Sequence, residues 1–329
     1  MPARETRLAQ LIGTAPAFQA MVARLPTLAR ADATVLITGE TGTGKELVAR
    51  AVHELSVRAA RPFVALNCGA LVDTLLEGEL FGHERGAYTD ARERRAGLIA
   101  HARGGTVFLD EAEALTPRAQ VTLLRVLQER TYRPLGSSAE HHVDVRFVAA
   151  TNARLDAMVH EGGFRADLYY RLCVFSITLM PLRERRDDIL PLSSHFLAKH
   201  GGGRAVELAP ATVDALLTYD WPGNIRELES AIVRAVHLAP GAVVAPADLG
   251  LPGLHAGSWP LALRPPGPLA PYKMEKRRVL DEFERGYLAR LMTESRGNVS
   301  RAARAAGKER RDLGKLLKRH GVDPRSFAA

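Results

Sequence analysis

A glycine-rich loop at residues 39–46, with the sequence GETGTGKE, constrains the fold of this chain more than any other feature. The segment before it, residues 34–38, is short, apolar and β-branched, which is typical of a buried parallel strand. After the loop, apolar residues recur at helical spacing: Leu47, Val48, Ala51, Val52 and Leu55. A strand, a glycine loop and a helix in this order place backbone N–H groups around a phosphate. The order therefore predicts an α/β domain that binds a nucleoside triphosphate.

The loop supplies the first candidate binding residues. Lys45 is expected to reach the β- and γ-phosphates as a point charge. Glu46 stands where the general motif has a Ser or Thr that binds Mg²⁺, so phosphate oxygens, water and another carboxylate must hold the metal. The residues expected to contact the nucleotide here are Gly39, Glu40, Thr41, Gly42, Thr43, Gly44, Lys45 and Glu46.

A second apolar strand, residues 106–109, ends in Asp110 and Glu111. Two acids at the carboxyl end of a buried strand are costly unless they have a role there. We expect Asp110 to hold Mg²⁺ through water and Glu111 to polarise the water that attacks the γ-phosphate. A third strand, residues 145–150, runs into Asn152, whose amide could sense the γ-phosphate. These strand ends predict an enzyme that hydrolyses the nucleotide.

Three arginines extend the candidate site. Arg165 and Arg171 lie six residues apart, and arginine suits contact with a nucleotide held by a neighbouring subunit. Composition alone also allows both to be surface ion-pair formers. Arg226 falls in the first turn of a predicted helix that follows residues 221–223. A cation there opposes the helix dipole, so an anionic ligand explains it better than helix stability does.

Taken together, these segments resemble the AAA+ central domain of bacterial enhancer-binding proteins, the activators of sigma-54 RNA polymerase. The similar strings lie in family order between residues 11 and 250: GETGTGKE, FVALNCGAL, ELFGHERGAYTDA, GGTVFLDEAEAL, LLRVLQE, DVRFVAATN, FRADLYYRL, PLRERRDDI and WPGNIREL. In that family a Glu after the loop lysine is usual. The resemblance implies a parallel α/β nucleotide-binding subdomain at residues 1–183 and a helical lid at residues 184–250. It also implies a ring, usually a hexamer, with ATP and Mg²⁺ between subunits.

The resemblance also implies residue roles. Lys45 becomes the phosphate lysine, Asp110 and Glu111 the metal and water residues, and Asn67 the residue that restrains Glu111 until the partner is engaged. The other implied positions are Asn152 as first sensor, Arg165 and Arg171 as arginines acting in trans, Arg226 as second sensor, and Ile12 and Gly13 beside the nucleotide.

The family inserts a loop, usually ending in GAFTGA, that touches sigma-54. The equivalent residues here are Gly86, Ala87, Tyr88, Thr89, Asp90 and Ala91. Tyr88 keeps an aromatic ring and Thr89 is retained, but Asp90 replaces a glycine and adds a charge. Desolvating that carboxylate would be costly unless it meets a cation. Arg92, Arg94 and Arg95 follow and could neutralise it, so we expect a modified sigma-54 contact. Residues 97–100 depart further, since the family more often has a Phe and a Glu there.

Positive charge is concentrated at the C-terminal end. Residues 272–329 hold 16 of the 45 Lys and Arg and 8 of the 37 Asp and Glu, which accounts for the whole net charge of +8. Such a segment suits double-stranded DNA as the partner. Its apolar spacing predicts a helix ending near Gly297, a short helix capped by Asn298, a turn at Gly307 and a helix over residues 309–319.

These helices predict a helix-turn-helix unit at residues 272–329, similar to the Fis-type domain of most enhancer-binding proteins. A solvated basic helix is the alternative. The residues expected to face DNA are Ser300, Arg301, Lys308, Arg310, Arg311, Lys315, Lys318 and Arg319.

Residues 240–271 hold eight prolines and almost no charge, which predicts a semi-extended tether with the domain linker at residues 251–271. Residues 243–249 could instead belong to the last lid helix. The two cysteines, Cys68 and Cys173, lack metal-ligand spacing and are expected to be buried and reduced, as in a cytoplasmic protein. No signal peptide or long apolar run appears, so no membrane insertion is expected.

These features favour a DNA-bound, ATP-hydrolysing activator that remodels the sigma-54 polymerase closed complex. Only about ten residues precede the first matching segment, so control is expected from a separate protein, from abundance or from assembly on DNA. Two alternatives stay open: an AAA+ regulator of another polymerase, because of the altered loop, and a nucleotide-gated DNA-binding repressor.

Overall fold

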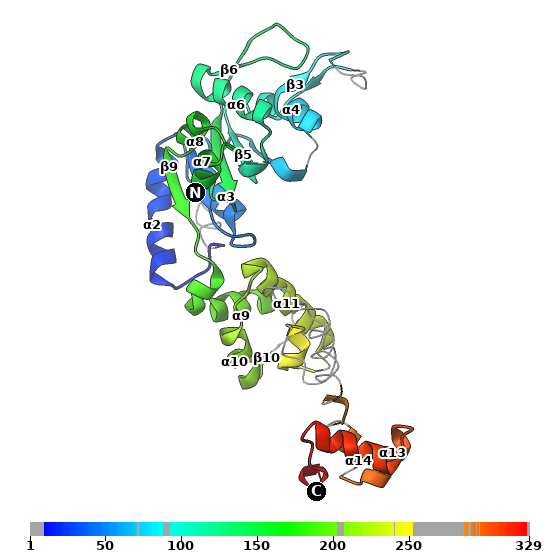
Figure 1. Ribbon diagram of the computed structural model, residues 1–329. Helices are drawn as coiled ribbons and strands as arrows, with labels where there is room; N and C mark the ends of the chain where they lie inside the picture. Colours follow the sequence, from blue (N-terminus) through cyan, green and yellow to red (C-terminus); the bar gives the residue numbers. More distant parts are fainter. Residues whose placement is uncertain are drawn as a thin grey trace. The chain divides into compact units, whose positions relative to one another are not determined.

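A computed structural model describes residues 10–70, 73–87, 93–202, 207–239, 241–252, 284, 286–288, 291–293, 295 and 297–327 (Figure 1). The chain divides into two compact units, residues 1–254 and residues 255–329. The first unit contains a parallel sheet with its helices, followed by a smaller helical part. The second unit is a small group of helices.

The sheet has five parallel strands in the order β2-β5-β8-β1-β9. Their bounds are β1 Val35–Thr38, β2 Phe63–Asn67, β5 Thr106–Asp110, β8 Arg146–Thr151 and β9 Phe175–Thr178. Each inner strand is an almost continuous apolar run because helices cover both faces. The predicted α/β fold with a parallel sheet is confirmed.

Helices connect the strands and pack on the two faces of the sheet (Figure 1). They are α2 Pro16–Arg30, α3 Lys45–Glu54, α4 Asp73–Phe81, α5 Leu98–His101, α6 Pro117–Glu129, α7 Leu155–His160 and α8 Ala166–Leu172, with short 3-10 turns η1 Cys68–Ala70 and η2 Ala112–Ala114. One apolar cluster holds α4, α6 and α8 against the sheet, and a second lies under α2 and α3. Helix α3, which follows the glycine loop, is therefore anchored by its apolar face.

Two small hairpins stand beside α4 and α6: β3 Gly82–His83 with β4 Arg95–Ala96, and β6 Thr131–Tyr132 with β7 His141–His142. Gly82 has φ +78, and a Cβ added to Gly97 would lie 2.3 Å from the Gly82 nitrogen. Both glycines are thus needed for the close backbone crossing at the base of the loop that holds residues 84–94.

The helical part of the first unit begins with the 3-10 turns η3 Leu182–Glu184 and η4 Arg186–Asp188. It continues through α9 Ile189–His200, β10 Glu207–Leu208, α10 Pro210–Thr218, α11 Asn224–Leu238, β11 Val243–Val244 and η5 Pro246–Leu249. Its own apolar cluster surrounds Trp221, which is fully buried and donates its indole N–H to the Leu216 carbonyl at 2.8 Å.

The prediction of a tether starting at residue 240 is wrong for residues 241–252. β11 pairs with β10, and η5 packs against α11. This segment is therefore packed against the other lid elements, and it does not extend the last helix. Val244, Leu249 and Leu251 are at most 2% exposed, and burial of these three side chains outweighs the local proline content. The rest of the predicted linker, residues 253–271, lies outside the described residues.

The second unit contains α13 Val299–Ala305, α14 Arg310–Arg319 and η6 Pro324–Phe327. The Asn298 side chain caps α13 by accepting from the Ser300 and Arg301 nitrogens, both at 3.1 Å. Gly307 has φ +61 in the turn between the helices. The side chains that form the apolar centre are Leu288, Leu291, Met292, Ala302, Ala303, Leu313 and Leu317.

Arg146 ties the middle of the sheet to the end of α2. Its side chain is 2% exposed overall and donates to the carbonyls of Leu28 (2.9 Å), Ala29 (2.7 Å) and Ala33 (3.1 Å). The carbonyls of Leu28 and Ala29 belong to the last turn of α2, where no intrahelical donor is available, and that of Ala33 lies in the segment between α2 and β1.

Replacing Arg146 with methionine, which fills similar space without donors, should leave three shielded carbonyls unpaired. We expect the free energy of unfolding to fall by about 3 kcal/mol or more, measured as a lower midpoint in chemical denaturation. The control is Arg24→Met on the exposed side of α2. Equal midpoints for the two variants would contradict the capping role of Arg146.

Candidate functional site

The glycine loop connects β1 to α3 and forms one wall of the site. Lys45 is the first residue of α3, and its Nζ donates to the carbonyls of Gly39 (2.7 Å) and Glu40 (3.1 Å). Gly42 has φ +80, and a Cβ there would lie 2.2 Å from the Gly223 carbonyl oxygen. The loop therefore tolerates no side chain where it meets the start of α11.

The acids after β5 face Lys45 across the site. Burial raises the pKa of Asp110, although the Glu111 N–H, which donates to Asp110 Oδ1 at 3.1 Å, and Lys45 both lower it. Burial lowers the pKa of Lys45 in turn, while Asp110, Glu113 and Glu111 oppose that shift. The charges of Lys45 and of the acids at the end of β5 thus affect one another.

Glu111 adopts a backbone conformation that is rare for a residue with a side chain, with φ +54. Its carboxylate lies against Gly69, since a Cβ added to Gly69 would come within 2.2 Å of Glu111 Oε2 and 3.4 Å of Asn67 Oδ1. The Asn67 amide oxygen accepts from the Gly69 N–H at 2.8 Å. The structure therefore brings Asn67 and Glu111 to the same glycine, and strained backbone of this kind clusters at functional sites.

The third strand end adds Asn152, which lies between the loop and the acids. Asn152 Nδ2 donates to Thr41 Oγ1 at 3.4 Å. Because β8 lies between β1 and β5 in the sheet, the amide is held in the gap between their carboxyl ends.

Three side chains of the lid, those of Arg183, Arg185 and Asn224, form hydrogen bonds with the glycine loop. Arg183 binds Glu40 with both guanidinium nitrogens, at 2.8 and 2.5 Å, and holds the pKa of Glu40 below its usual value. Asn224, which is fully buried with φ +53, donates to the Thr41 carbonyl (3.0 Å) and Glu40 Oε2 (3.2 Å). Its own Oδ1 accepts from the Leu182 N–H at 2.7 Å. One side chain thus joins the loop, the lid helix and the segment between them.

The start of α11 also bonds directly to the loop. The backbone nitrogens of Ile225 (3.0 Å) and Arg226 (3.3 Å) both donate to the Gly42 carbonyl. The Arg226 side chain is exposed. Its positive charge lowers the pKa of Lys45. Arg226 is therefore placed beside the loop by its own backbone.

A cavity of about 400 Å³ opens between the loop, the segment before α2, and the lid. Its lining includes Ile12, Thr43, Gly44, Leu192, Phe196 and Ile225. Mostly apolar walls next to a phosphate-binding loop suit a nucleotide base. Gly13 lies just outside, packed against Phe18 and Asp188. Ile12 thus shares a cavity with Thr43 and Gly44 of the loop.

The remaining predicted residues lie apart from this centre. Arg165 is half exposed and pairs with Asp167 at 2.7 Å, and Arg171 lies exposed on the same helix, α8. Glu46 faces along α3 and pairs with Arg50 at 2.7 Å. The structure does not bring Arg165 and Arg171 to the loop of the same chain.

The residues near the loop fit a hydrated divalent cation that bridges to phosphate. Asp110 Oδ1 has a single donor, the Glu111 N–H, and Glu113 Oε2 is buried without a hydrogen-bond partner among the described residues. No group of three or more metal-ligating side chains occurs in the described part of the chain.

The structure describes residues 84–87 and 93–94 of the segment that corresponds to the family's sigma-54 loop. Gly86 has φ +81 with open space around it, and Ala87 packs near Gly136. Tyr88, Thr89, Asp90, Ala91 and Arg92 lie outside the described residues. Arg94 pairs with Glu84 at 3.3 Å and Arg95 with Glu79 at 2.6 Å, so both already have acidic partners.

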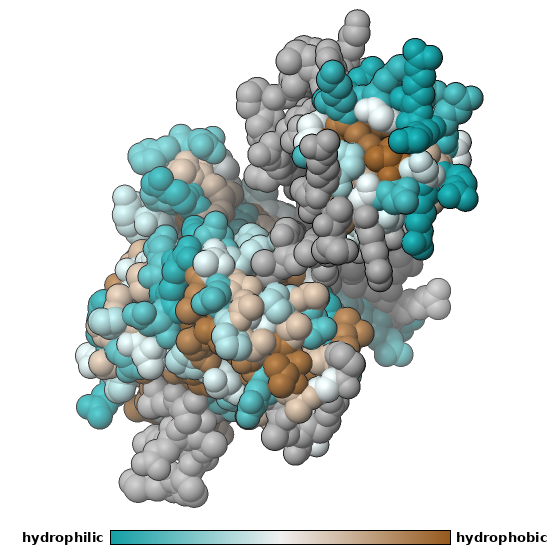
Figure 2. All heavy atoms as spheres, turned by 90° about the horizontal axis from the view of Figure 1, so that it is seen from below, coloured by the Kyte–Doolittle hydropathy of each residue, from teal (hydrophilic) through white to brown (hydrophobic). Residues whose placement is uncertain are grey.

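The candidate DNA-binding residues lie on α13, α14 and the turn between them. All except the half-buried Ser300 are exposed, whereas Leu313 and Leu317 of α14 point into the unit. Hydrophilic atoms surround a small apolar area on the face of this unit in Figure 2. Lys315 pairs with Asp312 at 3.4 Å, which reduces its availability for phosphate.

Sequence reasoning missed Asn224, Arg183 and Glu113. Asn224 and Arg183 lie in motifs that it quoted, and the signal for Asn224 was an asparagine next to a glycine at a helix start, where positive φ is common. The cysteines are free, but Cys173 is only partly buried, contrary to expectation. Among the described helices, none is both long and apolar enough to cross a membrane.

Comparison with known proteins places these motifs in a family context. Residues 11–178 match the model of the sigma-54 interaction domain, and residues 183–255 match that of the AAA+ ATPase lid domain. The transcriptional regulatory protein ZraR of Klebsiella oxytoca is 45% identical over 318 residues, which cover 95% of this chain and 70% of ZraR. The Nif-specific regulatory protein of Bradyrhizobium diazoefficiens is 39% identical over 365 residues, covering 99% of this chain and 63% of that protein.

Solved structures agree with this context. The crystal structure of NtrX from Brucella abortus aligns with a TM-score of 0.69 at 33% identity, covering 98% of this chain and 71% of NtrX. NtrX in complex with ATP aligns with the same TM-score and identity, covering 95% of this chain and 69% of NtrX.

Proposed function

Because this chain belongs to the sigma-54-dependent transcriptional activators, whose sigma-54 interaction domain is an AAA+ ATPase, we propose that it couples ATP turnover at the loop to movement of residues 84–94 against sigma-54 polymerase. The observation that carries the proposal is the joint placement of Lys45, Asp110, Glu111 and Asn152 at adjacent strand ends. Lys45 binds the phosphates, Glu111 positions and polarises the attacking water, and Asn152 holds the γ-phosphate side of the site.

Mg²⁺ is proposed as the metal, held by Asp110 and phosphate oxygens. When bound, it supplies positive charge that offsets the charge developing on the transferred phosphoryl group. Lys45 and the N-terminus of α3 act on the same phosphates, so the acids of the site are balanced by cations on the loop side.

A ring is proposed because Arg165 and Arg171 are exposed and, among the described residues, neither side chain bonds to the glycine loop. A neighbouring subunit in a ring, a hexamer in this proposal, would present its nucleotide to them. The basic face of α13 and α14 supports double-stranded DNA at an enhancer site as the second partner. A separate regulatory protein and a cytoplasmic location complete the proposal.

The direct test is a pull-down of sigma-54 by the protein trapped with an ATP transition-state analogue. The wild-type protein should retain sigma-54 only in the trapped state, because the loop contact depends on the nucleotide. Asp90→Gly should bind at least as well, since the charge that would have to be desolvated in the contact is removed.

The alternatives predict other outcomes. Binding by Asp90→Gly alone would show that Asp90 has ended the sigma-54 contact and would favour another polymerase partner. Absence of binding by both proteins, with normal ATP turnover, would contradict the proposed partner. Normal DNA binding without any ATP turnover would favour a nucleotide-gated repressor.

A further inference from the structure

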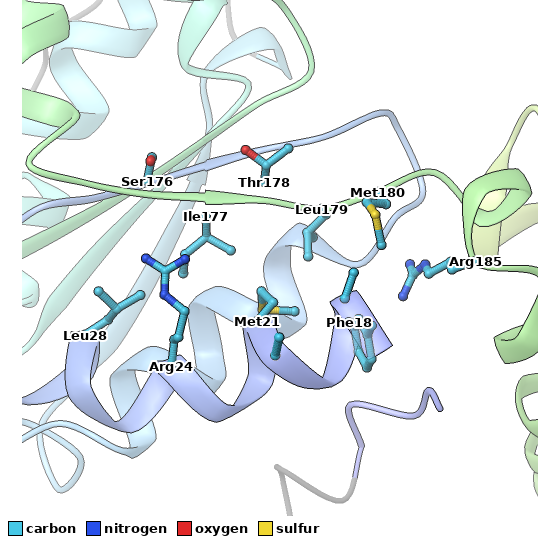
Figure 3. A pocket seen from close by; sticks show the side chains of 12 residues that line it. Phe18, Met21, Arg24, Leu28, Ser176, Ile177, Thr178, Leu179, Met180 and Arg185 are labelled. Carbon is cyan, nitrogen blue, oxygen red and sulfur yellow. The ribbon is translucent and has the colours of Figure 1, made fainter. Parts of the chain in front are cut away.

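A groove separate from the nucleotide cavity runs between α2 and the edge strand β9 (Figure 3). Its volume is about 390 Å³. Figure 3 shows Ile177 and Leu179 pointing toward α2, whereas Ser176 and Thr178 point to the other side of the strand, as alternation along a strand requires. The side chains that make its interior apolar are Phe18, Met21, Leu28, Ile177, Leu179 and Met180.

Arg185 closes one end of this groove and is not fully satisfied by the protein. Its side chain is 1% exposed, and Nη2 donates to the Thr43 carbonyl at 3.2 Å. Its Nε and Nη1 have no hydrogen-bond partner among the described residues. Asp188 forms an ion pair with Arg185, Oδ2 to Nη1 at 3.7 Å, but this separation is longer than a hydrogen bond and leaves Oδ2 without a donor among the described residues.

Neighbouring residues hold Asp188 and the Arg185 guanidinium in these positions. Asp188 Oδ1 accepts from the Thr14 and Ala15 nitrogens, so Asp188 is held by the segment before α2. The guanidinium carbon lies 4.9 Å from the centre of the Phe18 ring, on its face. Buried donors without an acceptor are rare and destabilising, so this pair of N–H groups is suited to an anionic acceptor in the groove.

A second arginine lines the groove from α2. Figure 3 shows the Arg24 guanidinium reaching from the helix toward β9. Arg24 is exposed, and no side-chain hydrogen bond or ion pair is recorded for it within the described residues. An apolar interior with a cation at each end is complementary to an anion that carries an apolar body.

We propose that the groove binds a small organic carboxylate with an apolar body, whose carboxylate is held by Arg185 or Arg24 and whose body packs on Ile177, Leu179 and Met21. Arginine recognises carboxylates with two parallel hydrogen bonds, and the volume is that of a small-molecule site. Arg185 also lines the nucleotide cavity and bonds to Thr43 of the loop. Binding in the groove therefore alters the affinity for ATP, and ATP alters binding in the groove by the same factor.

Titration calorimetry with 2-naphthoate tests this site on the full chain saturated with ADP, which fills the nucleotide cavity. The matched ligand is 2-naphthylmethanol, which has the same rings and no charge. We expect 2-naphthoate to bind and the alcohol to bind at least about tenfold more weakly, because the arginines act only on the anion. Equal affinities, or no binding of 2-naphthoate, would overturn the proposal.

Three variants locate the binding within the groove. Ala20→Phe places a ring from an exposed position of α2 into the groove and should abolish the 2-naphthoate signal. Arg24→Met should weaken 2-naphthoate roughly fivefold, whereas Arg30→Met, an exposed arginine of the same helix outside the groove, should not change it. Undiminished binding by Ala20→Phe, or equal effects at Arg24 and Arg30, would contradict the site. Thermal unfolding of each variant verifies that it is folded.

Discussion

Replacing Glu111 with glutamine is expected to lower ATP turnover roughly a hundredfold or more while nucleotide binding persists. The amide keeps the size of the side chain but cannot polarise or accept a proton from the attacking water. Binding should be unchanged or tighter, because one negative charge near Lys45 and the phosphates is removed. Phosphate release measures turnover, and titration with ATP measures affinity.

The matched control is Glu113→Gln, two residues away in η2. This change also removes a negative charge that acts on Lys45, but Glu113 does not lie against Gly69 as Glu111 does. Because Glu113 is one of the acids near the expected metal, we expect some loss of turnover, but at least about tenfold less than in Glu111→Gln. If the two variants lose turnover equally, the charge of the cluster, and not the position of Glu111, is what turnover requires.

Replacing Asn224 should weaken ATP binding strongly, since this residue joins the loop to the lid. Asn224→Gly keeps access to positive φ but removes two donated bonds and the acceptor for Leu182 N–H. Each shielded group left unpaired costs about 1–3 kcal/mol. We expect the dissociation constant for ATP to rise at least about tenfold, with a lower free energy of unfolding.

Asn224→Ala separates the two contributions. Alanine removes the same bonds and also disfavours the φ of +53 by roughly 1 kcal/mol. Asn224→Ala should therefore bind ATP more weakly than Asn224→Gly and have a lower free energy of unfolding. Trp221, buried three residues earlier, gives a fluorescence signal for the state of the lid. Wild-type affinity in Asn224→Gly would show that the lid is held to the loop by the other contacts alone.

The sequence predicted the parts of the fold that depend on local pattern. The strands at residues 34–38, 106–109 and 145–150 are short and largely apolar, and each is observed within one or two residues of its predicted bounds. The AAA+ fold was predicted from the resemblance of the phosphate-site motifs to those of the family. The cap at Asn298 was also predictable, because its side chain needs only backbone groups two and three residues away.

Contacts across the tertiary structure were beyond the same reasoning. The bond between Asn224 and Thr41 joins residues 183 positions apart, and no periodicity indicates it. Arg146 looks like a polar interruption of a strand until α2 is known to end beside it. Residues 241–252 were assigned to a tether on proline content, because burial of Val244 and Leu249 against α11 depends on a helix packed next to them.

The position of β8 has a consequence for the chemistry that no single side chain carries. β8 lies between β1, which leads into Lys45, and β5, which leads into Asp110. Neighbouring strands are about 4.8 Å apart, so the backbones of β1 and β5 lie roughly 10 Å apart. The hydrogen-bonded backbone of the sheet thus fixes the width of the phosphate site. The side chains of Lys45 and Asp110 reach into the space between these two backbones, since each alters the pKa of the other.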